Sequence, residues 1–173
     1  MLNKGMMTLV VAFGLMVSEG GRLVLVAQEA ADRQYLLETI GDAAVVQLYA
    51  DGFEALSLRE KTLIWHLYEA ALAGRDIYYD QRYEHNLEMR EVLEEIITHP
   101  TNVESRTMEA IHAYTKLFWL NTGPFNNLTA RKFVIETTPA AFRAAVMDAA
   151  QAGAAFPVRD GETVAQMVER MTP

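Results

Sequence analysis

The clearest hydrophobic pattern along the chain lies between residues 57 and 74. Apolar side chains recur there at steps of three and four residues, the spacing that places them on one face of a helix. They are Leu63, Ile64, Leu67, Tyr68, Ala71 and Leu72. Ser57 and Glu60 have the spacing of a capping box, and Gly74 stands where a left-handed C-cap is expected. The pattern predicts a helix that begins after Ser57 and ends at Gly74.

The same periodicity predicts two further helices between residues 87 and 121. The first spans residues 87–98, and Pro100 ends it. Its apolar face carries Met89, Val92, Leu93, Ile96 and Ile97, and its other face carries Glu88, Glu91, Glu94 and Glu95. The second has Ser105 as its predicted N-cap. Its apolar face consists of Met108, Ile111, Thr115, Phe118 and Trp119.

The remaining segments complete a mainly α fold. Residues 28–40 favour a helix because they are rich in Ala, Glu, Gln and Leu, and Gly41 ends it. Two more helices are expected at residues 138–151 and 163–171, the first with Pro in its first turn. Short strands are expected near residues 43–49 and 132–136. We expect about five to six helices packed as one helical lobe, with one or two short strands.

Residues 75–81, R-D-I-Y-Y-D-Q, are predicted to be a polar, aromatic connection after the first of these amphipathic helices. Asp76 and Asp80 are either a carboxylate pair for acid–base chemistry or cation binding, or turn-forming residues of the connection. The second interpretation is favoured, because two carboxylates without a longer series of oxygen ligands are nonspecific. Tyr78 and Tyr79 are of a type found more often in a core or at its rim than in a substrate platform.

Composition and charge narrow the functional classes. The 173 residues are 51% hydrophobic and 22% charged, which is typical of one globular domain or a piece of a larger one. The net charge is −8 and no Lys/Arg block interleaves with aromatic residues, so nucleic acid is a poor partner. The chain has no cysteine, which excludes disulfides, thiol catalysis and cysteine-bound zinc.

Residues 1–27 have two interpretations. The apolar run from Met6 to Val17 follows Lys4 and has the length of the hydrophobic region of a signal peptide, but it is too short to span a bilayer. Residues 18–22 interrupt it, and the cleavage site that follows is weak. The segment is therefore either a secretory signal, which places the protein in the periplasm or outside the cell, or an irregular extension or misassigned start of a cytoplasmic protein.

Side chains that could catalyse a reaction are scarce. The four histidines form no H-E-x-x-H and do not pair at helical spacing, so the usual two-histidine zinc helix is absent from the sequence. Glu109 and His112 form one E-x-x-H unit, whereas di-iron bundles need two such units and further glutamates. There is no glycine-rich phosphate loop and no G-x-S-x-G elbow. We expect no catalytic residue, metal ligand or cofactor site in this chain.

A polar loop follows the third helix of the 57–121 region, where L-F-W-L runs into N-T-G-P-F-N-N. Asn, Gly and Pro break helices, and amide side chains can both donate to and accept from a peptide backbone. The candidate substrate-binding residues are Asn121, Gly123, Phe125, Asn126 and Asn127. The alternative is a helix-ending turn whose asparagines satisfy local backbone groups.

Three stretches resemble the N-terminal part of bacterial dipeptidyl peptidase III and its relatives. They are residues 53–81, N-L-E-M-R-E-V-L-E-E-I from Asn86, and F-W-L-N-T-G-P-F-N-N-L-T-A-R-K-F-V from Phe118. The resemblance covers roughly residues 30–147, and its most specific parts are A-G-R-D-I-Y-Y-D-Q and the asparagine loop. The chain departs from many relatives at Ile135, where they have proline.

This resemblance implies a two-lobed zinc metallopeptidase that removes dipeptides from the N-termini of peptides. In that family the zinc lies in the other lobe, on a helix with H-E-x-x-G-H, where the metal and a general-base glutamate activate water. The motif does not occur in this chain. We expect residues 28–173 to be an incomplete N-terminal lobe, a wall of the peptide cleft that is inactive alone. The alternative is a noncatalytic helical module that binds peptides or other partners.

These expectations define the partners. A peptide substrate and the missing zinc-bearing lobe are expected, and nucleic acid and a stable membrane span are not. A lobe separated from its partner lobe exposes an apolar face, so self-association is also expected.

Overall fold

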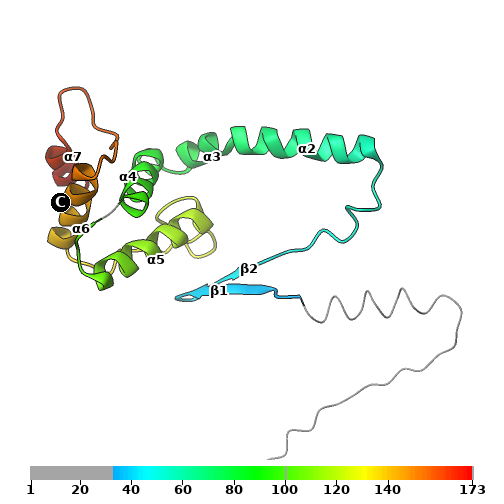
Figure 1. Cartoon of the computed structure of the whole chain (residues 1–173), viewed down its shortest axis with the longest axis horizontal. Helices are drawn as coiled ribbons and strands as arrows, with labels where there is room; N and C mark the ends of the chain where they lie inside the picture. Colours follow the sequence, from blue (N-terminus) through cyan, green and yellow to red (C-terminus); the bar gives the residue numbers. More distant parts are fainter. Residues whose placement is uncertain (1–32, 100, 173) are drawn as a thin grey trace, which may run out of the picture.

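The computed structural model describes residues 33–99 and 101–172, so the predicted signal or extension at residues 1–27 lies outside the described residues. The elements are β1 (Leu36–Ile40), β2 (Ala43–Val46), α2 (Leu58–Ala73), α3 (Arg75–Arg82), α4 (Asn86–Thr98), α5 (Ser105–Asn121), α6 (Pro139–Gln151) and α7 (Val164–Met171). Helices α4 to α7 form a bundle, and α3 and α2 extend away from it (Figure 1). The prediction of a mainly α fold is confirmed.

The two strands form an antiparallel hairpin. The prediction of a helix at residues 28–40 is therefore wrong for residues 36–40, which form β1. Leu36 pairs with Val46, and Ile40 pairs with Ala43. Gly41 between the strands has φ +55°, which glycine adopts freely and a tight hairpin turn requires. Pairing with β2 therefore determines the conformation of residues whose individual propensities favour helix. The strand predicted near residues 43–49 is confirmed over β2.

Helix α2 begins as predicted but ends differently. The Ser57 amide donates to Glu60 Oε2 at 2.8 Å and the Glu60 amide donates to Ser57 Oγ at 3.4 Å, so the capping box is formed. The left-handed C-cap is wrong, because Gly74 has φ −85°. Helix α3 follows at once, so the connection expected at residues 75–81 is helical. Packing explains the difference, because α3 buries Tyr79 against α5.

The core lies between α4, α5, α6 and α7. Its most deeply buried side chains include Val92, Ile96, Ile111, Phe118, Val146, Met167 and Val168. Helix α5 has Glu104 at its N-cap, so the prediction of Ser105 as cap is wrong by one residue, because Ser105 is already helical. Thr138 caps α6 by accepting from the Ala141 amide at 3.1 Å, and Pro139 lies in the first turn as predicted.

The strand predicted at residues 132–136 is wrong. Lys132 forms a single antiparallel bridge with Phe125, and the Phe133 amide donates to the Pro124 carbonyl at 2.8 Å. The chain then runs on to α6, and no second strand lies beside residues 134–136 in the part of the chain that the structure describes. Without a partner strand, the β-branched residues of this segment form no strand in the described part of the chain.

Candidate functional site

The loop predicted to bind peptide begins where α5 ends, at Asn121. Thr122 and Gly123 have positive φ angles of 50° and 147°, and the helix stops at this turn. Gly123 lies against the buried side chain of Asn86, the first residue of α4. A Cβ added at Gly123 would lie 2.9 Å from both Nδ2 and Oδ1 of that side chain. Glycine fits this close approach, whereas any other residue forces Asn86 to shift.

The amides of Asn121 and Asn126 are used inside the loop. Asn121 Nδ2 donates to the Leu117 carbonyl at 2.9 Å, and its Oδ1 accepts from the Asn127 amide at 3.0 Å. Asn126 Oδ1 accepts from the backbone amides two and three residues further on, both at 2.9 Å. These are the contacts of a turn whose asparagines satisfy local backbone groups, so both side chains hold the loop in shape.

Of the five predicted substrate-binding residues, Phe125 and Asn127 are exposed. The Phe125 side chain is 37% exposed and meets the Tyr83 ring edge-on, with ring centroids 6.1 Å apart. The Asn127 carboxamide makes no hydrogen bond among the described residues, although its backbone amide is bonded. The loop therefore presents an aromatic ring and a carboxamide for ligand contact, and their role in substrate binding stays a prediction.

Asp76 on α3 is held in an ion pair with Arg90, and Asp80 follows it by one helical turn. Arg90 Nη1 donates to Asp76 Oδ1 at 2.8 Å, and the guanidinium lies 4.9 Å from the centroid of the Tyr79 ring. This hydrogen bond lowers the pKa of Asp76. Asp80 and Tyr78 are exposed. A carboxylate already bound to a buried guanidinium is a poor general base, so the contacts of Asp76 are those of a structural residue.

The two most specific sequence motifs, A-G-R-D-I-Y-Y-D-Q and the asparagine loop, meet in the structure. Tyr79 stacks on Phe118 at the end of α5, with ring centroids 6.0 Å apart. Asn86 Nδ2 donates to the carbonyl of Tyr79 at 2.9 Å and to that of Thr122 at 3.1 Å. Asn86 therefore links α3 to the loop by hydrogen bonds. Helical periodicity could not identify it, and its only sequence signal is its place at the start of the resembling stretch N-L-E-M-R.

Zinc, which the resemblance implies for the full-length family protein, does not fit the side chains described here. In residues 33–99 and 101–172, no three His, Cys, Asp or Glu side chains gather where they could hold a metal ion. Glu109 and His112, the E-x-x-H unit, are both exposed on α5. We therefore derive no catalytic step through a metal for this part of the chain.

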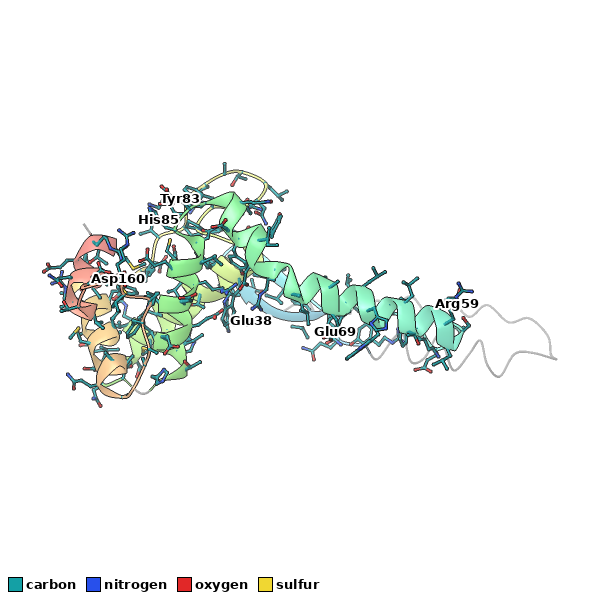
Figure 2. All side chains as sticks on the ribbon, turned by 90° about the horizontal axis from the view of Figure 1, so that it is seen from above. Glu38, Arg59, Glu69, Tyr83, His85 and Asp160 are labelled. Atoms are coloured by element: carbon teal, nitrogen blue, oxygen red, sulfur yellow. The ribbon has the colours of Figure 1, made fainter. Side chains whose placement is uncertain are left out.

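Helix α2 has an uncovered apolar surface, which we call the α2 face. It comprises Leu58, Leu63, Ile64, Trp65, Leu67, Tyr68 and Leu72, whose exposed fractions range from 41% to 80%. No residue of α2 is buried, and Figure 2 shows the helix extending from the bundle past Glu69 to Arg59. None of the helices in the described ranges is both long and apolar enough to cross a membrane. Large exposed apolar patches are typical of interaction sites.

The structure thus brings together Tyr79, Asn86 and the asparagine loop, and it places Asp76 and Asp80 four residues apart on α3. Comparison with known proteins adds no identification: no protein-family model matches the chain, and a search of curated proteins finds no match either. The functional interpretation therefore rests on the contacts described above and on the sequence resemblance.

Proposed function

We propose that this chain forms part of the N-terminal lobe of a dipeptidyl-peptidase-III-like zinc peptidase and supplies one wall of its peptide cleft. The observation that carries the proposal is the contact between the two stretches that resemble this family most specifically. Asn86 hydrogen-bonds to both of them, although Thr122 lies 36 residues further along the chain. The A-G-R-D-I-Y-Y-D-Q stretch and the asparagine loop are far apart in the sequence but pack together. This packing supports a binding site to which both stretches contribute.

In this proposal the chain positions the peptide, and the chemistry belongs to another lobe. Phe125 and Asn127 contact the substrate from a loop whose shape is fixed by Asn86, Asn121 and Asn126. A loop fixed in this way can hold a peptide with little loss of conformational entropy on binding. The zinc and the general-base glutamate are supplied by the partner lobe, which docks on the α2 face.

The α2 face leads to the first prediction, self-association of the purified chain. Leu67 is 61% exposed halfway along α2, so Leu67→Glu places a charge on the α2 face and is expected to reduce both association and binding of a hydrophobic dye. Analytical ultracentrifugation over a range of concentrations measures the effect. Leu128→Glu is the control, because Leu128 is 95% exposed but lies on the asparagine loop.

Two outcomes would contradict the proposal. A monomer that binds no hydrophobic dye would mean that the α2 face needs no partner lobe. Zinc-dependent release of dipeptides from a dipeptidyl-naphthylamide by purified residues 1–173 would mean that catalysis does not need another lobe.

A noncatalytic peptide-binding module is the second candidate, and the exposed ring of Phe125 favours it. Trp119 is 41% exposed close to the loop, so its fluorescence reports on ligands there. In a Trp65→Phe background, which leaves Trp119 as the only tryptophan, short peptides are expected to cause a saturable change that Phe125→Ala weakens. No change at millimolar peptide would contradict peptide binding by the loop.

A further inference from the structure

A cavity of about 710 Å³ lies between α4, the segment 132–139, α6 and the end of α7. Most of its wall is apolar, formed by Met89, Val92, Leu93, Phe133, Ile135, Phe142 and Met171. This volume lies within the range of pockets that bind small molecules. Neither the sequence motifs nor the peptide-cleft proposal assigns a role to it.

The cavity is cationic, although the chain has a net charge of −8. Lys132, Arg159 and Arg170 line it, and Glu88 is the one carboxylate among the lining residues. Arg170 is already bound to Glu88 at 3.0 Å and to Glu162 at 2.8 Å, and Arg159 lies 4.0 Å from Glu88. Lys132 has no ion pair within the described residues. Three cations therefore face two carboxylates, which leaves one positive charge in excess.

A largely buried tyrosine, Tyr114, also lines the cavity. Tyr114 is only 6% exposed, and its hydroxyl makes no hydrogen bond in the part of the chain that the structure describes. Burial raises the pKa of Tyr114 to about 12, so the hydroxyl remains a hydrogen-bond donor at neutral pH. A ligand oxygen in the cavity can therefore accept a hydrogen bond from this hydroxyl.

We propose that this cavity binds a monocarboxylate with an apolar body. The ligand's single negative charge matches Lys132, one carboxylate oxygen accepts from the Tyr114 hydroxyl, and the apolar body lies against the wall around Phe133 and Phe142. A phosphate dianion fits less well, because Arg159 and Arg170 already have carboxylate neighbours. Either a medium-chain fatty acid or the C-terminus of a short apolar peptide has this chemistry. This site goes beyond the peptide-cleft proposal and does not depend on it.

Calorimetric titration of residues 1–173 with decanoate and with decanol tests the role of the charge. Decanoate is expected to bind about tenfold more tightly than decanol, since decanol lacks the charge-assisted hydrogen bond. Lys132→Gln is expected to weaken decanoate binding by about tenfold for the same reason. Arg131→Gln is the matched control: it removes the same charge from the neighbouring residue, which does not line the cavity, and binding should not change.

Two further arms locate the site and identify the source of the ligand. Tyr114→Phe keeps the ring and is expected to weaken decanoate binding about threefold to fivefold, with an unchanged melting temperature as proof of folding. An apolar tripeptide with a free C-terminus is compared with its C-terminal amide and with decanoate. If the free tripeptide binds more tightly than decanoate, the site is assigned to peptides. If decanoate binds more tightly than the tripeptide, the site is assigned to fatty acids. Equal binding of decanol and decanoate, no effect of Lys132→Gln, or no binding of either carboxylate would overturn the proposal.

Discussion

Gly123→Ala is expected to lower the free energy of unfolding by about 2–4 kcal/mol, through backbone strain and a steric clash that act together. Gly123 has φ +147°, which residues with a side chain rarely adopt. The new Cβ would also lie 2.9 Å from the Asn86 amide group. Asn86 is 1% exposed and is fixed by its bonds to Tyr79 and Thr122, so it cannot move away without losing them.

Urea denaturation followed by circular dichroism measures this loss, and Gly153→Ala is the matched control. Gly153 also has a positive φ, +103°, but nothing lies within 4 Å of an added Cβ. This variant therefore has the strain without the clash, and a loss of about 1–2 kcal/mol is expected. If Gly123→Ala were no more destabilising than Gly153→Ala, Asn86 would not be the fixed link between α3 and the loop.

The sequence predicts helices well where the signal is local. The start of α2 depends on Ser57 and Glu60, which are neighbours along the chain, and the start of α6 depends on Thr138 and Pro139. The apolar faces of α4 and α5 follow from a helical period that holds whatever their partners are. These elements are therefore confirmed close to their predicted bounds, apart from the N-cap of α5.

The errors occur where distant residues determine the conformation. Residues 36–40 have helix-favouring side chains but pair with β2, and residues 75–81 look like a connection but form α3 because Tyr79 packs against Phe118. The predicted strand at residues 132–136 fails for the opposite reason, because no partner strand lies beside it among the described residues. Local propensity cannot report the presence or absence of a partner.

In the candidate site, too, the sequence predicts the local features and misses those that depend on distant contacts. The sequence predicts that the asparagine loop follows α5, but it cannot tell which amides bind the backbone of the loop itself. The structure shows Asn121 and Asn126 engaged there and Asn127 with an exposed carboxamide. The cavity was not predicted either, because Lys132 and Tyr114 lie in different segments and their common position depends on the packing of α4, α5 and α6.

Phe118→Ala is expected to be the most destabilising single change, with a loss of about 3–5 kcal/mol in unfolding free energy. Phe118 is 1% exposed, and its ring centroid lies 6.0 Å from that of Tyr79 and 6.3 Å from that of Tyr114. Its removal leaves a cavity where α3 and α5 meet, so the support of the asparagine loop is lost together with core packing. Chemical denaturation measures the loss.

Phe125→Ala makes the same chemical change later in the same motif and serves as the comparison. Its side chain is 37% exposed, so less apolar area is lost from the folded state, and a loss of about 1 kcal/mol is expected. The two variants separate the roles of the phenylalanines, because Phe118→Ala should impair folding, whereas Phe125→Ala should impair peptide binding in a protein that remains folded. A similar loss of stability in both would place Phe125 in the core and remove it from the proposed peptide contacts.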